Sequence, residues 1–136
     1  VDFVRSPSSV QGVAQIGRPS IAHATATGKV LLAFGGTTLP PGPLRRYTAR
    51  TIADPRALAR QIDQIKARGW AETIGEREED LAAVAAPVFG SRGELAAIIG
   101  VQGPVARFDT AARVAVLEPL RDAAVELSGR LGWIAP

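Results

Sequence analysis

The chain has 136 residues, of which 46% are hydrophobic and 21% are charged, and its formal net charge is +3. This length predicts one domain, and so apolar a chain with so small a net charge is not expected to be disordered. The absence of Cys excludes a disulfide framework, a thiolate metal site and a cysteine nucleophile. The chain has no Met and begins with Val1, so we expect a processed or excised piece of a longer protein.

Composition also bears on the compartment and on the partners of the protein. The longest uncharged apolar run, 81–89, has about half of the roughly 18 residues that suggest a membrane span, and the N-terminus does not resemble a signal peptide. We therefore expect a cytoplasmic protein with no membrane partner. The pI of about 10.2 raises the possibility of nucleic-acid binding. However, the arginines are scattered and only Arg45 and Arg46 are adjacent, so surface arginine is the simpler interpretation.

The first half of the chain predicts two strands and a helix. Residues 1–17 have the pattern of strand, turn and strand. A helix follows that begins at Ala24 or Thr25 and stops at a pair of glycines, and its apolar face is expected to hold Val30, Leu31 and Phe34.

Gly28 lies inside that predicted helix, where it costs about 1 kcal/mol relative to Ala. A close approach of another chain segment or of a ligand would explain this cost.

A loop over residues 39–50 leads to the clearest local signal in the chain. Residues 54–69 form a predicted helix in which Asp54 is the N-cap, Pro55 takes the first helical position and Gly69 ends the helix.

The next segment predicts three strands. Residues 70–74 form the first, and the charged residues 75–80 form a loop. Residues 81–89 and 95–102 form a hairpin with a short glycine-bearing connection, and the pair Gly103-Pro104 is expected to break its ladder.

A terminal helix is predicted over residues 109–131, with Asp109 or Thr110 as its cap and Pro119 as a kink or division. Its expected apolar stripe consists of residues at steps of three and four: Val114, Leu117, Leu120, Ala124, Leu127 and Leu131. Strands joined by short turns and flanked by helices predict an antiparallel sheet in an α+β domain.

Six short segments stand in a distinctive order. They are HATATGK at 23–29, TIADP at 51–55, ARGW at 67–70, GERE at 75–78, AAPVF at 85–89 and GP with RF at 103–108. In this order and spacing they resemble the effector-binding domain of IclR-type bacterial transcription regulators, over essentially the whole chain.

The resemblance implies a GAF-like domain, in which a curved, mainly antiparallel sheet has helices packed around it. It implies that residues 1–136 are one effector-binding domain, N-terminally trimmed, without its first elements and without the winged helix-turn-helix domain that binds DNA. It also implies a homodimer or homotetramer, and contact with DNA only through that absent domain. Two departures from the family pattern, Ile21-Ala22 before the His and Asp80 in place of a frequent Gly, mean that the identity of the effector is not carried over.

The start of the first helix is a candidate binding site for a small organic acid. The leading N–H groups of a helix have no internal partners and lie at the positive end of its dipole. Ala26, Thr27 and Gly28 are small enough to leave these groups open to a carboxylate. The alternative is that the threonines only cap the helix.

Strand residues would form the opposite wall of that site. The resemblance places five residues toward the cavity: Thr73, Leu81, Ala83, Gly100 and Gln102. Small residues would leave room and polar ones would bind, as in other small-ligand sites, whereas the alternative is ordinary strand packing with Gln102 at an edge. The expected effector-binding set is Thr25, Ala26, Thr27, Gly28, Thr73, Leu81, Ala83, Gly100 and Gln102.

His23, the only histidine, raises the alternative of a small enzyme that acts on a carboxylic acid. His23 would be the base, with Ser20 or Thr25 as nucleophile, but no serine lies in a nucleophile-elbow pattern. We therefore expect a hydrogen-bonding histidine and no catalytic residues.

No metal or cofactor is expected. One His without Cys supplies too few ligands for a typical zinc site, and the glycines form no Walker or dinucleotide fingerprint. The acidic residues of the 75–80 loop are expected to be solvated.

The leading interpretation is a ligand-sensing regulatory domain, and a third possibility is a GAF-like sensor coupled to another output. Phe34, Trp70 and Trp133 are the candidate anchors of the core or of an interface.

Overall fold

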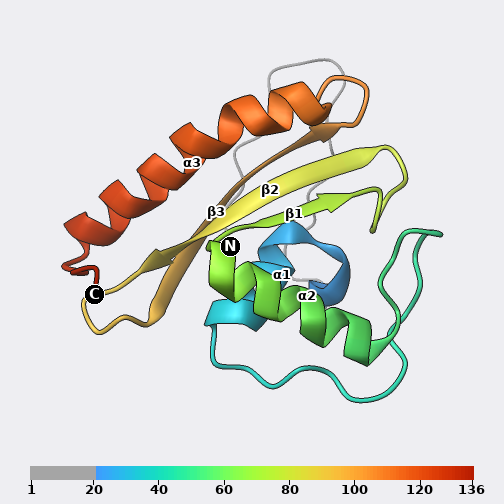
Figure 1. Cartoon of the computed structure of the whole chain (residues 1–136), viewed down its shortest axis with the longest axis horizontal. Helices are drawn as coiled ribbons and strands as arrows, with labels where there is room; N and C mark the ends of the chain where they lie inside the picture. Colours follow the sequence, from blue (N-terminus) through green and yellow to red (C-terminus); the bar gives the residue numbers. More distant parts are fainter. Residues whose placement is uncertain (1–20) are drawn as a thin grey trace.

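The computed structural model describes residues 21–136, and the strand–turn–strand expected over 1–17 lies outside them. Within this range one antiparallel sheet, in the order β1-β2-β3, has α1 and α2 on one face and α3 on the other (Figure 1). The elements in chain order are the 3-10 turn η1 (Ala22–Ala24), α1 (Ala26–Phe34), α2 (Pro55–Arg68), β1 (Ala71–Ile74), β2 (Leu81–Phe89), β3 (Leu95–Pro104) and α3 (Thr110–Arg130). The expected α+β class is confirmed. No helix in this part of the chain combines the length and the apolarity that crossing a membrane requires.

The helix α2 begins and ends as the sequence predicts. The side chain of Asp54 accepts a hydrogen bond from the Arg56 amide at 3.1 Å, and Pro55 is the first helical residue. Gly69 ends the helix with φ at 87°, a left-handed conformation that glycine adopts without a Cβ clash.

The helix α1 begins at Ala26, one residue after Thr25, the later of its two predicted starts. Thr25 is its N-cap and Ala24 belongs to η1. The expectation that Leu31 faces the core is wrong, because this side chain is 41% exposed. Val30 is buried as expected, together with Ala26 and Ala33, and the charged Lys29 is buried on the same helix.

The sheet separates two apolar clusters. Ala71 and Ala85 pack with α1 and α2, whereas Val84 and Val88 pack with α3 on the opposite face. The ladder between β2 and β3 continues to the pair Leu81↔Pro104, so the expected break at Gly103 is wrong. Pro104 is tolerated there because it is the last residue of its strand.

The helix α3 is continuous, so Pro119, which is exposed, does not divide it. The cap is Asp109, whose side chain accepts a hydrogen bond from the Ala112 amide at 2.9 Å. The predicted apolar stripe is only partly buried, since Val114 is 68% exposed. Leu127 and Leu131 are 41% and 50% exposed.

Polar residues take part of the sheet-facing side of α3. Arg113 and Ser128 are buried there beside Leu120 and Ala124, and hydrogen bonds satisfy them. This is why the apolar spacing alone misplaced the buried stripe.

The aromatic anchors lie at the ends of the sheet. The ring of Phe34 packs edge-on against Phe89 at 5.6 Å between centroids, and Phe89 in turn lies 5.2 Å from Trp133. Trp70 packs against the cluster under α3, with the guanidinium of Arg68 3.9 Å above its ring.

Candidate functional site

The first turn of α1 is only partly capped by its own chain. The hydroxyl of Thr25 accepts a hydrogen bond from the Gly28 amide at 3.1 Å, and the Thr25 carbonyl accepts one from the Lys29 amide at 2.9 Å. Among residues 21–136, no acceptor is bonded to the amides of Ala26 and Thr27. The alternative that threonine caps the helix therefore accounts for one leading amide, and those of Ala26 and Thr27 have no acceptor within residues 21–136.

Gly28 is required by the chain itself. A Cβ built at this position would lie 2.3 Å from the Cα atom of Ala22 and 2.5 Å from its carbonyl oxygen. Of the two explanations left open by the sequence, a close approach of another chain segment is therefore sufficient.

Two rows of small and polar residues cross the sheet on the face that carries α1. Thr73, Ala83 and Gln102 are in register across the strands. The next row is Ala71, Ala85 and Gly100. Because residues two apart on a strand share a face, both rows lie on the same side as the alanines that pack against α1.

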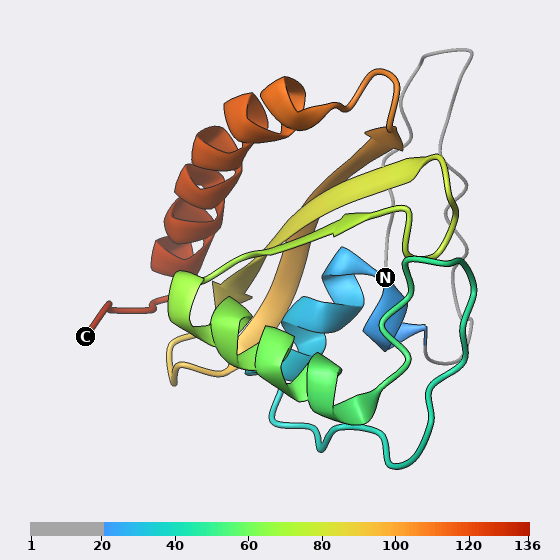
Figure 2. The ribbon, with the colours of Figure 1, turned by 45° about the vertical axis from the view of Figure 1, so that its right-hand side comes forward.

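The tip of α1 reaches β3 at Gly100. A Cβ built on Gly100 would lie 3.5 Å from the Thr27 methyl group. Thr27, Gly100 and Gln102 are all exposed, so this part of the face is open to solvent, whereas Thr73 is only 6% exposed. The two walls predicted from the sequence, the helix tip and the strand residues, do lie together (Figure 2).

Other members of the expected set contribute less. Ala26 is 1% exposed as a whole residue, so neither its side chain nor its amide is in contact with solvent in this structure. The Thr25 hydroxyl is engaged in capping, and its second hydrogen bond goes to the Ile21 carbonyl at 3.4 Å. Leu81 is half-buried at the beginning of β2, opposite Pro104 and two residues from Ala83.

A buried ion pair lies behind the tip of α1. The ammonium of Lys29 donates to Glu76 Oε1, and the two side chains are 0% and 10% exposed. Burial lowers the pKa of Lys29 and raises the pKa of Glu76, and in each case the partner's charge opposes that shift. The expectation that the 75–80 loop is solvated is therefore wrong for Glu76. No periodic pattern could pair residues 47 positions apart, although both lie in the segments that carry the family resemblance.

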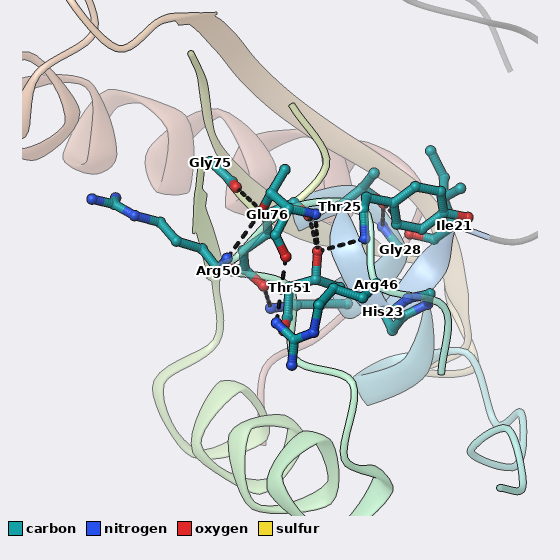
Figure 3. Close-up of polar contacts among 12 residues, drawn as sticks. Ile21, His23, Thr25, Gly28, Arg46, Arg50, Thr51, Gly75 and Glu76 are labelled. Carbon is teal, nitrogen blue, oxygen red and sulfur yellow. Dashed lines mark hydrogen bonds and ion pairs between the residues drawn. The ribbon is translucent and has the colours of Figure 1, made fainter. Parts of the chain in front are cut away.

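A loop packs against the turn that holds Glu76 (Figure 3). The hydroxyl of Thr51 donates to the Glu76 carbonyl at 2.6 Å, and that of Thr48 donates to the Gly75 carbonyl at 2.5 Å. The guanidinium of Arg46 donates to the Thr51 carbonyl at 3.0 Å. Hydrogen bonds from this loop and the ion pair with Lys29 therefore both hold the Glu76 turn.

His23 has a structural role. Its Nε2 donates to the carbonyl of Arg45 at 2.7 Å, and its ring lies 5.7 Å from that of Tyr47. Thr25, one of its two expected nucleophilic partners, is bonded to Ile21 and Gly28 instead. Ser20 lies outside the described residues. In the described part of the chain, no group of three or more His, Cys, Asp or Glu residues is arranged to hold a metal ion.

The chain matches known transcriptional regulators over most of its length. A family model for the C-terminal domain of the bacterial transcriptional regulator IclR covers residues 1–129. The HTH-type transcriptional regulator BhcR of Paracoccus denitrificans is 39% identical over 117 residues, which are 82% of this chain and 42% of that protein. The chain spans between 42% and 54% of the length of three such relatives.

Solved structures give the same result. The crystal structure of Thermotoga maritima IclR matches with a TM-score of 0.84 at 29% identity, covering 97% of this chain and 56% of that one. A double mutant of the inducer-binding domain of PobR from Acinetobacter, in complex with 3-hydroxybenzoic acid, matches with a TM-score of 0.72 at 29% identity. That match covers 79% of this chain and 65% of that one. These relatives are named as regulators and not as enzymes, in agreement with the expectation that the chain has no catalytic residues.

Proposed function

The chain belongs to the family of IclR C-terminal domains of bacterial transcriptional regulators, and from this premise we propose that it senses a small organic acid. The carboxylate would bind the amide of the exposed Thr27, beside the buried start of the helix at Ala26, and the rest of the molecule would lie against β3. The observation that carries this proposal is the contact of the partly uncapped helix tip with Gly100. A helix N-terminus binds anions through its free N–H groups and its dipole.

The neighbouring residues suit a small ligand. Gly100 lets the helix tip approach β3, Ala83 is small, Leu81 would supply an apolar contact, and Thr73 and Gln102 would supply polar groups. The PobR inducer-binding domain, which is 29% identical to this chain, is described as a complex with an aromatic carboxylic acid. This supports a carboxylic acid as the class of ligand.

Binding would act through a population shift. A ligand that prefers one arrangement of subunits moves the equilibrium toward it by its difference in affinity. The subunits would form a homodimer or homotetramer, and DNA would be bound through a winged helix-turn-helix domain outside this chain. The names of HTH-type relatives support that role, which also implies a cytoplasmic location.

Exposed apolar residues give the proposed assembly a physical basis. Val125, Leu131 and Ile134 are 61%, 50% and 87% exposed at the C-terminal end of the chain. Val125→Glu should reduce the molar mass measured by light scattering if this surface lies between subunits.

The experiment that tests ligand binding is a thermal-shift and calorimetric screen of small carboxylates. 3-Hydroxybenzoate, benzoate and acetate would be compared with 3-hydroxybenzamide, which has nearly the shape of the first but no charge. A carboxylate that binds the folded chain raises its melting temperature by mass action, and the amide should not. A chain stabilised equally by the acid and the amide would contradict an anion site.

Two variants locate the site. Thr27→Val and Gln102→Leu remove polar groups from exposed positions and should weaken binding about tenfold or more without changing stability. The matched controls are Thr38→Val and Gln64→Leu, which make the same changes at exposed positions away from the tip of α1. Equal losses in the variants and in the controls would place the ligand elsewhere.

A further inference from the structure

The buried ion pair between Lys29 and Glu76 carries a desolvation cost that is large for a domain of this size. Moving two charges out of water costs several kcal/mol per ion, which their mutual attraction offsets only with good geometry. Two apolar side chains of similar volume would often give equal or greater stability at such a position. Its presence at the base of α1 therefore suggests a role beyond stability.

The pair connects the tip of α1 to the turn between β1 and β2. Lys29 directly follows Gly28. Its amide donates to the Thr25 carbonyl at the start of the helix. Side chains on a helix lean toward its N-terminus, so the Lys29 ammonium lies toward the tip.

The turn that carries Glu76 leads directly into the opposite wall of the proposed site. The Gly75 amide donates to the Leu81 carbonyl at 2.8 Å, and Leu81 begins the strand that contains Ala83. On its outer side, the turn accepts the hydroxyl hydrogen bonds of Thr48 and Thr51 (Figure 3). One end of the ion pair is therefore fixed to the sheet, and the other belongs to the helix that carries the Thr27 amide.

We infer that Lys29 and Glu76 are positioning residues of the anion site: their bond sets how far the tip of α1 stands from β3. This inference rests on the proposed function, and neither residue is required to touch the ligand. The charged groups facing the pair are Arg68 at the end of α2 and His23 in η1. Neither replaces the direct bond, because the Nε2 atom of His23 is bonded to the Arg45 carbonyl and the guanidinium of Arg68 lies over Trp70.

The test is a double variant that removes both charges and keeps the volume, Lys29→Met with Glu76→Met. The matched control is Arg113→Met with Glu72→Met, which removes the ion pair between α3 and β1 on the other face. Both chains should fold, the first with a melting temperature close to that of the wild type. The second should melt at a lower temperature, because the Phe108 carbonyl loses its Arg113 donor. Backbone amide NMR signals of residues 26–28 should move in the first double variant and stay unchanged in the second.

Binding provides the second measurement. The affinity for 3-hydroxybenzoate, or for the best carboxylate of the screen, should fall about tenfold or more in the Lys29/Glu76 variant and stay within about twofold in the control. Unmoved tip amides, or an unchanged affinity despite moved amides, would overturn the inference. Moved amides in a protein whose wild type binds no carboxylate would leave the positioning of the tip intact and refute the proposed function.

A measurement on the wild-type chain covers the case in which the double variant does not fold. The side-chain carboxyl carbon of Glu76 reports its own ionisation, separately from that of His23. If the pair positions the tip, the amides of residues 26–28 should shift with the same midpoint as this carbon, while α3 amides do not. If the amide signals of residues 26–28 do not change as Glu76 ionises, the inference is overturned without any substitution.

Discussion

The two faces of the sheet carry different side chains. Near the tip of α1 the strands present the small residues Ala83, Ala85 and Gly100, so that the tip can approach β3. Toward α3 they present Val84 and Val88, which pack with Phe108 and Leu120 in an ordinary apolar layer. The first face is partly open and holds a buried ion pair, and the second is closed by a long helix. Changes on the first face should therefore alter stability and ligand binding together, whereas changes on the second should alter stability alone.

The largest expected effect is that of Lys29→Met as a single substitution. It leaves the Glu76 carboxylate buried without its cation, and breaking a buried pair in this way costs about 3–5 kcal/mol. Urea unfolding should show this loss at neutral pH. As a control, Arg130→Ala breaks an exposed pair with Glu126 on α3 and should change stability by less than about 1 kcal/mol.

The loss in Lys29→Met should depend on pH. Burial raises the pKa of Glu76, and removing Lys29 takes away the charge that opposes this rise. A group whose pKa is higher in the folded state stabilises it most below its unfolded pKa, and this contribution is lost as pH rises through the folded pKa. The free-energy loss should therefore be smaller near pH 5 than at pH 7. An equal loss at both values would contradict a buried, charged Glu76.

The next effect tests the closed face. Arg113 is 6% exposed and donates to the Phe108 carbonyl at 2.8 Å, to the Thr110 hydroxyl at 3.1 Å and to Glu72 at 3.0 Å. Arg113→Met leaves a buried carbonyl without its donor and should cost about 1–3 kcal/mol in urea unfolding. Its carboxylate affinity, measured by calorimetry, should match that of the wild type. A weakened affinity would show that the two faces are coupled.

The sequence correctly predicted features that depend only on neighbouring residues, such as helix caps. The cap and the end of α2 depend on Asp54 and Gly69 alone, and both were placed correctly. The buried faces of α1 and α3 were partly misplaced, because polar side chains such as Lys29 and Ser128 find partners far away in the sequence. Polarity predicts exposure only where no such partner exists.

The candidate site divides in the same way. Local signals predicted the helix start, and the family resemblance placed Gly100 in the opposite wall. The structure brings Thr27 close to Gly100. The register that aligns Thr73, Ala83 and Gln102 was not predictable, because it depends on how the strands pair. The ion pair behind the tip was missed for the same reason, since the fold alone brings its two segments together.

The smallest effect compares the caps of the two helices that cover opposite faces. Thr25→Ala and Asp109→Ala each remove the side chain that accepts a leading amide, and each should cost about 1 kcal/mol. Their responses to 3-hydroxybenzoate should differ. In Thr25→Ala the Gly28 amide loses its acceptor and joins that of Thr27 at the tip, so the bound acid should raise the melting temperature more than in the wild type. In Asp109→Ala the ligand-induced shift should equal that of the wild type, because the start of α3 is not part of the site. Equal shifts in both variants would mean that the carboxylate does not bind at the tip of α1, and the distinction drawn between the two faces would fail.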